Sequence, residues 1–582
     1  MNTLGSQEWF TNSKRLPFTL PSTACVLLIS TMAIRFAFLA RRRASLTEIR
    51  SPANSPIFLR AGMRPSVNKP RPWIELLLNI SKNQCNRESG NTSGYGAAAG
   101  FCYTALDFVM RASPMTERLH HLGYPIYLLM LSAVAAYAVL RLPGYLTNPG
   151  FLGSLVFLQI IVVMLWRFEV RFFPFLMFIF LMAGADVPWL HSPAAAARWT
   201  VLAVGAVGGL ILYLRRKPFG LGVFHLLAGF AVLAALVSAW ESAYTQVSIL
   251  KAISLLLLCL YGSFGARLAV SRREEAFFAT VLLGGEILTY ASAVLFFGLR
   301  ISWLGNPNSL GAAMSIFAVP LLFWGVLEAK KPSTRRQLVF ALGLAWALLL
   351  SSYARAGIVA GLMATLFLCA GRREYKMLAK LLAFVVVAAL MVANFFPRYV
   401  SNGSSLMGFV YKQGESRGVL GSRKSPWEKT VQSVQEHPWL GTGFGTSDTS
   451  NSVESGTQLS APTTETAAGG REHGNSYLEI LEWVGILGVV PFAALIILLL
   501  ANVGIVFRKM RTGSVLAAPA SLLGAFVLAG LTHAFFEDWL FAPGSYLCVF
   551  FWAMAYILQD FVPGRDAVSN KFPGMYSPFR PT

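Results

Sequence analysis

The chain has 582 residues, of which 55% are hydrophobic and only 13% are charged. Apolar runs of about 18 to 22 residues recur along it, and each is long enough to cross a hydrocarbon core of about 30 Å as a helix. The runs do not alternate in polarity, which excludes the pattern of a membrane β-barrel. The composition therefore predicts an all-α polytopic membrane protein.

The net charge of +22 does not indicate a nucleic-acid partner, because lysine and arginine collect in short segments between the apolar runs. That distribution is expected for the cytoplasmic loops of a membrane protein. The six cysteines have no metal-ligand spacing and no disulfide pattern. We therefore expect no nucleic-acid binding and no cysteine metal site.

Residues 1–121 differ from the rest of the chain. Residues 20–40 are moderately apolar but contain Arg35, and three arginines follow at 41–43. This stretch is consistent with an extra membrane span, with a poor signal-like sequence or with an upstream extension. Residues 44–121 are rich in serine, proline, asparagine and arginine without periodicity, so we expect a basic, disordered cytoplasmic region.

From Tyr124 onward the apolar runs become regular and predict about fourteen transmembrane helices. We expect a transmembrane bundle at 122–396, C-terminal transmembrane helices at 476–562 and a cytoplasmic tail at 563–582. The predicted spans are 124–141, 149–166, 172–190, 197–214, 219–239, 248–270, 276–298, 308–328, 338–352, 355–371, 379–396, 476–506, 514–533 and 541–561.

Basic residues mark every second connection between these spans. The basic clusters lie at 167–171, 215–217, 267–273, 330–336, 372–376 and 508–511, and the connections between them have almost none. By the positive-inside rule the basic set is cytoplasmic. The other set then faces outward, into the periplasm of a Gram-negative envelope, and both termini are cytoplasmic.

A polar segment at residues 397–475 separates the two groups of spans and predicts a long periplasmic loop domain. A loop of this length is more often functional than idle. Ser425 and Pro426 are typical of a helix start, and the helix must end before Pro438. We expect the glycine-rich residues 440–445 to form a flexible turn, and residues 451–470 to be mobile without a ligand.

Several unusual residues share the predicted outer side. Arg300 and Arg355 border apolar runs, where a charged side chain usually faces a partner or a water-filled cavity. Guanidinium groups bind phosphate oxygens in bidentate fashion. His473 is the outer residue best suited to proton transfer near neutral pH, and Glu479 and Glu482 follow it on the next helix. A simpler alternative for Arg300 and Arg355 is that each extends its charged group to the membrane surface. For His473 it is a hydrogen-bonded loop residue without a catalytic role.

Other acidic and histidine residues give weaker indications. His533, Glu537 and Asp538 cluster at another outer end, but their spacing is a weak indication of a metal site and we predict none. Glu286 lies inside the predicted span 276–298, where we expect a structural hydrogen-bonding group or part of a polar cavity.

Two short motifs lie at outer ends of the main bundle. Residues 305–311 read Gly-Asn-Pro-Asn-Ser-Leu-Gly, with Arg300 a few residues upstream. Residues 352–357 read Ser-Tyr-Ala-Arg-Ala-Gly, at the point where one predicted span turns into the next.

A third motif is spread over the long loop. Residues 423–427 read Arg-Lys-Ser-Pro-Trp, 437–443 read His-Pro-Trp-Leu-Gly-Thr-Gly, and 473–478 read His-Gly-Asn-Ser-Tyr-Leu. In this order the three motifs resemble the Asn-Pro-Asn element, the Ser-Arg-Gly turn and the long loop of the O-antigen ligase and polymerase family of membrane glycosyltransferases. The family's usual form has histidine directly before asparagine, whereas Gly474 intervenes here.

The resemblance implies an enzyme that moves a glycan from a polyprenyl-pyrophosphate carrier to an acceptor hydroxyl on the periplasmic face of the inner membrane. The donor is already activated, so no metal or other cofactor is required. Arg300 and Arg355 would bind the pyrophosphate, and His473 would take the proton from the attacking hydroxyl or orient it. The implied substrate-binding residues are Arg423, Arg471, Asn306, Asn308, Asn475 and Glu479.

The sequence leaves alternatives open. Ligase and polymerase share the motifs, so the acceptor is a lipid, a protein or another glycan, and the long-loop pattern favours a ligase. A membrane transporter is a second class, although no internal repeat typical of transporters is visible. A metal-dependent transferase would carry paired acids in its first outer loop, but residues 142–148 have none. A structural protein of an envelope complex is the remaining alternative.

Overall fold

The structure is a computed structural model that describes residues 149–395, 421–447, 473–513 and 517–562, apart from 167, 187, 217, 272 and 302. Of the earlier residues it includes 132 and 136. The predicted N-terminal region 1–121, most of the first predicted span, the segment 451–470 and the tail 563–582 lie outside the described residues.

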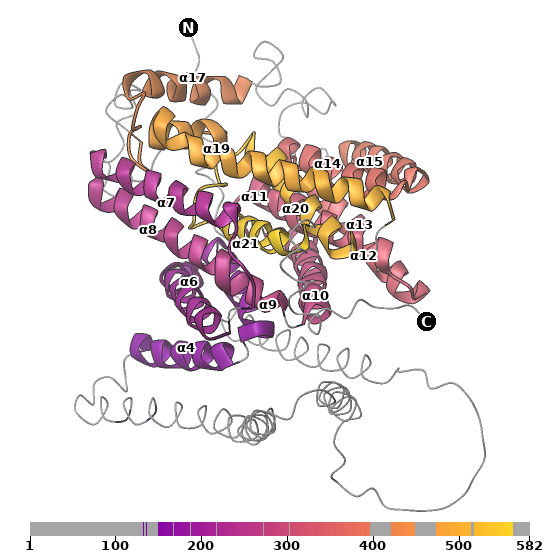
Figure 1. Cartoon of the computed structure of the whole chain (residues 1–582). Coiled ribbons are helices and arrows are strands. Elements are labelled where there is room, and N and C mark those ends of the chain that lie inside the picture. The colour runs from indigo at the N-terminus through magenta and orange to yellow at the C-terminus, as the bar shows by residue number, and fades with distance from the viewer. Residues whose placement is uncertain are drawn as a thin grey trace, which may run out of the picture. The chain divides into compact units, whose positions relative to one another are not determined.

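All regular elements of the described residues are helical, which confirms the all-α class (Figure 1). The α-helices are α4 (Pro149–Trp166), α5 (Phe173–Ala183), α6 (Pro188–Arg216), α7 (Val223–Glu241), α8 (Thr245–Leu260), α9 (Arg267–Ser271), α10 (Glu274–Ala293), α11 (Pro307–Ala313), α12 (Val319–Glu328), α13 (Pro332–Ser351), α14 (Arg355–Arg372), α15 (Tyr375–Phe395), α17 (Gly421–Glu436), α19 (Ser476–Arg511), α20 (Ala517–Ala534) and α21 (Tyr546–Phe561). Short π-helical turns join some of them, at η2 (Phe168–Phe172), η3 (Tyr261–Ala266), η4 (Val294–Gly298) and η5 (Met314–Ala318).

Seven helical segments in the described part of the chain are long and apolar enough to cross a membrane, which is the pattern of a multi-pass membrane protein. They are Pro193–Arg215, Val223–Glu241, Thr245–Ser271, Glu274–Gly298, Pro307–Glu328, Arg355–Arg372 and Ser476–Arg511. The expected total of about fourteen spans exceeds this number and stays a prediction. The predicted span 172–190 is too long, because α5 ends at Ala183 and α6 begins only at Pro188.

Two helical segments form the buried centre of the described bundle. In the span Pro307–Glu328, 83% of the most apolar window is buried. In α21 every residue from Leu547 to Gln559 is buried. Helices that are apolar all round belong inside a bundle, whereas α7, α8 and α19 expose large apolar side chains, as expected of helices that face lipid.

The predicted outer connections meet at one end of the bundle. The backbone N–H of Asp186 donates to the carbonyl of Trp303 at 2.8 Å. The Tyr546 hydroxyl, at the start of α21, donates to the Ser309 carbonyl in α11 at 3.0 Å. These contacts join three connections that the charge alternation assigns to the same side.

The opposite end of α21 is held by Arg267, which is 1% exposed at the start of α9. Its Nε donates to Asp560 Oδ2 at 2.8 Å, and its Nη2 bonds the second oxygen of the same carboxylate. The guanidinium carbon also lies 3.8 Å from the centre of the Phe219 ring. A bidentate pair stacked on an aromatic ring holds a buried arginine well. It ties the central helix to a connection predicted to be cytoplasmic.

Helix α19 is broken at Gly485, where φ is 66° and ψ is −175°. A break leaves backbone groups on both sides without their helical partners. The segment 438–443 supplies four replacement bonds. They run from Thr442 N–H to the Glu482 carbonyl (2.9 Å), from Gly443 N–H to Trp483 (3.1 Å), from Ile486 N–H to Pro438 (2.8 Å) and from Leu487 N–H to Trp439 (3.3 Å).

The two backbones approach so closely that only glycine fits. A Cβ on Gly485 would lie 2.3 Å from the Trp439 carbonyl oxygen, and one on Gly441 would lie 2.4 Å from that of Glu482. Phe444 next to this contact is fully buried. The expectation of a flexible turn at 440–445 is therefore wrong, because the turn is bonded to the helix break.

Helix α17 packs on α19 (Figure 1). It begins at Gly421, so the predicted start at Ser425 is four residues late and Pro426 lies inside the helix. Its end at Glu436, before Pro438, is as predicted. The Trp427 indole N–H donates to the Gly474 carbonyl at 3.2 Å, which fixes α17 beside the start of α19.

Candidate active site

His473 stands immediately before α19 and is held there by its backbone. Its N–H donates to Asp538 Oδ2 at 2.7 Å, and the N–H of Gly474 reaches the same oxygen at 3.4 Å. Gly474 has φ +63°, and a Cβ on it would lie 2.5 Å from Nη1 of Arg423. Glycine is therefore required at position 474 for two reasons: its backbone is left-handed, and the guanidinium group of Arg423 lies where a side chain would begin.

Asn475 and Ser476 attach this turn to the helix and to the neighbouring loop. Asn475 Oδ1 accepts bonds from the N–H groups of Tyr477 (2.8 Å) and Leu478 (3.1 Å), which makes Asn475 the N-cap of α19. The Ser476 hydroxyl donates to the Glu537 carbonyl at 2.7 Å. The loop between α20 and α21 is thereby fixed against the turn that carries His473.

The His473 ring, which is 1% exposed, lies among three carboxylates. Its Nε2 is 3.1 Å from Glu482 Oε2 and 3.3 Å from the Ser447 hydroxyl. Its Nδ1 is 3.8 Å from Glu479 Oε1 and 3.9 Å from Asp538 Oδ2. Glu479 and Glu482 are three residues apart on α19, so helical geometry directs both toward the ring.

Lys251 adds a positive charge to this cluster. It lies in α8, and its charge interacts with that of Glu479. Its ammonium also donates to the Gly445 carbonyl, next to the helix break. Sequence reasoning missed Lys251 and Ser447. The signal for Lys251 was a lysine inside an apolar run, which usually marks a buried partner.

Arg423 and Arg355 lie on the flank of the same region. Arg423 in α17 forms an ion pair with Glu537, and both side chains are largely buried, at 16% and 21% exposure. Arg355 is the first residue of α14 and is half-buried. It is close enough to Arg423 for the two positive charges to interact. Arg423 therefore lies beside the His473 turn, and its positive charge acts on Arg355.

The Asn-Pro-Asn element packs against the turn that carries Arg355. Asn306 Oδ1 accepts the N–H of Ser309 at 2.8 Å and caps α11. A Cβ on Gly311 would lie 2.3 Å from Cβ of Ala354, so the two segments touch directly. The structure thus brings two of the sequence motifs together at one outer end.

The remaining predicted residues are less closely connected. Arg300 is exposed and has φ 57°, and Asn308 is half-buried at the start of α11. Arg471 lies outside the described residues. Their roles stay predictions.

The second acidic cluster of the sequence is divided in the structure. His533 Nδ1 accepts the indole N–H of Trp539 at 2.9 Å, Glu537 pairs with Arg423, and only Asp538 faces His473. Glu286 accepts a bond from Gln337 Nε2 at 3.1 Å, as a structural hydrogen-bonding group would.

A different set of residues has the spacing of a metal site. One ligand atom each of His473, Glu479 and Asp538 lie within 4.8 Å of one another. Nitrogen and carboxylate oxygen are groups that divalent metals accept. However, Asp538 Oδ2 already accepts hydrogen bonds from two backbone N–H groups, and the positive charge of Lys251 already acts on Glu479. Both observations weaken the case for a metal ion here.

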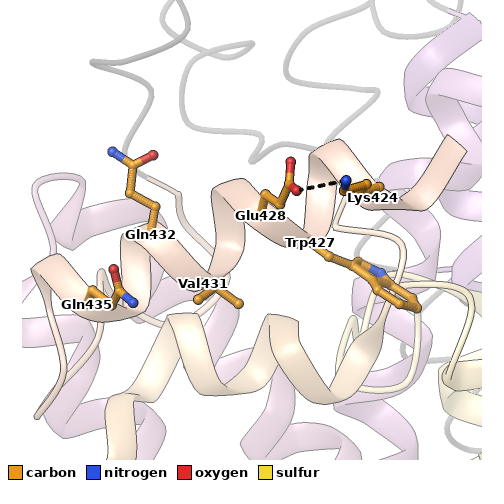
Figure 2. A pocket seen from close by; sticks show the side chains of 6 residues that line it. All are labelled: Lys424, Trp427, Glu428, Val431, Gln432 and Gln435. Carbon is orange, nitrogen blue, oxygen red and sulfur yellow. Dashed lines mark ion pairs between the residues drawn. The ribbon is translucent and has the colours of Figure 1, made fainter. Parts of the chain in front are cut away.

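A shallow pocket of about 340 Å³ lies along α17 (Figure 2). Trp427 and Val431 point to one side of this helix, while Glu428 and Gln432 point to the other. The exposed Lys424 and Glu428 form an ion pair of 3.8 Å. The pocket contains none of the groups around His473 and meets the site only through the Trp427 indole.

The described chain is thus a multi-helix membrane protein with a buried histidine–carboxylate cluster at the end where its polar loop joins the helices. Residues 337–493 match the family model described as O-antigen ligase. This match supports the resemblance to that family, and the matched residues include Arg355, Arg423 and His473. The match implies a membrane glycosyltransferase of ligase or polymerase type. No curated protein matches the chain.

Proposed function

We propose that the protein transfers a glycan from a polyprenyl-pyrophosphate carrier to an acceptor hydroxyl at the periplasmic face of the inner membrane, without a metal. The observation that supports this most is the buried His473 ring among three carboxylates, with the guanidinium group of Arg423 beside its turn. A base beside phosphate-binding cations is what transfer from a pyrophosphate carrier needs.

The roles follow from the charge of each group. Arg355 and Arg300 bind the pyrophosphate and stabilise the negative charge that develops as it leaves. His473 takes the proton of the acceptor hydroxyl. Because the pyrophosphate bond already activates the sugar, the cationic charge of arginines replaces that of a metal ion.

The predicted substrate-binding residues divide by their observed contacts. Arg423, held by Glu537 beside the His473 turn, contacts the donor or its glycan, and Arg471 is assigned the same role. Asn306 and Asn475 keep their helix starts in place while their motifs contact the substrate, and Asn308 contacts it beside Asn306. Glu479, whose Oε1 lies 3.8 Å from Nδ1 of His473, contacts the acceptor beside that ring.

A reconstituted transfer assay tests the proposal. Purified protein in proteoliposomes receives a labelled polyprenyl-pyrophosphate glycan and a mixed acceptor extract, with EDTA throughout. We expect transfer by the wild type and a loss of about 100-fold or more in His473→Ala. Arg355→Ala should also lose transfer. Arg336→Ala should not, because Arg336 lies at the end of α13 that is far from the Arg355 turn.

The products distinguish the two branches of the family. A single step in size on a gel indicates a ligase, which we propose, and a ladder indicates a polymerase. Normal transfer by His473→Ala would refute the role of that residue. Activity that EDTA removes and a divalent metal restores would refute metal independence and assign the 4.8 Å cluster of His473, Glu479 and Asp538 to a metal.

A further inference from the structure

The two nitrogen atoms of the His473 ring have different surroundings. On one side Nε2 is 3.1 Å from Glu482 Oε2, a hydrogen-bonding distance, and Glu482 is 1% exposed. On the other side Nδ1 has no hydrogen-bond partner among the described groups, although it is buried. A histidine that bonds a carboxylate through one nitrogen presents the lone pair of the other nitrogen to the substrate.

We propose that Glu482 is the positioning residue of His473. It accepts the Nε2–H bond, fixes this tautomer and ring orientation, and leaves Nδ1 as the atom that takes the proton. The inference rests on the proposed function, because it names the base atom of the same reaction. The Ser447 hydroxyl is hydrogen-bonded to the same Nε2 at 3.3 Å, and in the proposed tautomer it shares the Nε2–H as a second acceptor.

The space beside Nδ1 matches a hydroxyl group. Nδ1 lies 3.8 Å from Glu479 Oε1 and 3.9 Å from Asp538 Oδ2, which is too far for direct hydrogen bonds. A hydroxyl placed beside Nδ1 has one proton to donate, and Nδ1 takes it. Glu479 Oε2 also has no hydrogen-bond partner in the described chain, so a second donor group is needed there.

The open edge of this space lies at Asp538. The His473, Glu479 and Glu482 side chains are at most 4% exposed, whereas that of Asp538 is 23% exposed. An acceptor therefore enters past Asp538. Its hydroxyl gives its proton to Nδ1 and its oxygen forms the new bond to the anomeric carbon. The carbon–oxygen bond to the carrier breaks, and the polyprenyl pyrophosphate leaves with the electron pair.

The test compares Glu482→Gln with wild type in the full-length protein in lipid nanodiscs. Glutamine has the shape of glutamate but can also donate to Nε2, so both tautomers become accessible. We expect kcat to fall by about 100-fold or more, as for the loss of an orienting carboxylate, with the donor KM unchanged. Glu428→Gln, an exposed carboxylate on α17, is the matched control and should leave both parameters unchanged.

A spectroscopic measurement separates positioning from a merely structural role. In protein with 15N-labelled histidine rings, the His473 signals are identified by their loss in His473→Asn. We expect a protonated Nε2 and a bare Nδ1 in the wild type, and a mixture of tautomers in Glu482→Gln.

Two results would overturn the inference while the proposed function stands. One is a wild-type ring that carries its proton on Nδ1, which is measured without any Glu482 variant. The other is a Glu482→Gln protein that transfers glycan at the wild-type rate under conditions where His473→Ala does not. Normal transfer by His473→Ala would instead refute the proposed function.

Discussion

Replacement of Gly485 by alanine tests the contact between the break in α19 and the preceding loop. A Cβ at this position would lie 2.3 Å from the Trp439 carbonyl oxygen and 2.4 Å from its carbon. These are backbone atoms, so no side-chain rotation relieves the clash. The loop must withdraw, or the helix must straighten.

The cost follows from the geometry. The φ/ψ pair of 66° and −175° lies in a region occupied almost only by glycine, where strain in another residue costs about 1–3 kcal/mol. Withdrawal of the loop breaks four backbone bonds, each contributing about 1 kcal/mol. The expected loss of stability is therefore about 5–7 kcal/mol.

The assay measures the fraction of monodisperse protein left after heating in detergent, by size-exclusion chromatography. We expect Gly485→Ala to lower the midpoint by roughly 10 °C. Gly504→Ala is the control in the same helix, because a Cβ there meets no atom within 4 Å. If both variants lose the monodisperse peak at the same temperature, the backbone contact does not hold this region together.

Three further predictions follow from the contacts. Asn475→Ala should cost about 1 kcal/mol through the lost cap and lower glycan transfer by moving His473, whereas Asn475→Asp should retain both. Arg423→Glu should abolish transfer, and the exchange Arg423→Glu with Glu537→Arg should not restore it, because Arg423 contacts the donor as well as Glu537. Restored transfer would show that only the ion pair matters. Arg267→Lys should lower the midpoint in the same heating assay, because lysine cannot replace the bidentate bond to Asp560.

The sequence predicted the helices well because each apolar run carries its own signal. A helix lies at every predicted span from 149–166 onward, and the contacts of Asp186 with Trp303 and of Tyr546 with Ser309 join the connections that charge alternation had grouped. The positive-inside pattern predicts which helix ends lie on the same side of the membrane, because it reflects how the chain is inserted.

The details of the site could not be predicted in the same way. Glu482, Asp538 and Lys251 come from three different elements, and only packing places their charges around His473 or Glu479. The break at Gly485 depends on backbone bonds between residues 40 to 48 positions apart, which local preference does not encode. The N-cap formed by Asn475 could have been predicted from the sequence, because asparagine is a common residue directly before a helix.

The contact between Ser447 and His473 has a consequence for how this protein can change. The two residues are 26 positions apart in the chain, yet the Ser447 hydroxyl lies 3.3 Å from the His473 ring. The two ends of the intervening stretch are therefore close together. Doubling the length of such a closed stretch costs only about 0.6 kcal/mol in chain entropy. The length of chain between these two residues can therefore vary at little cost to the helices that hold His473.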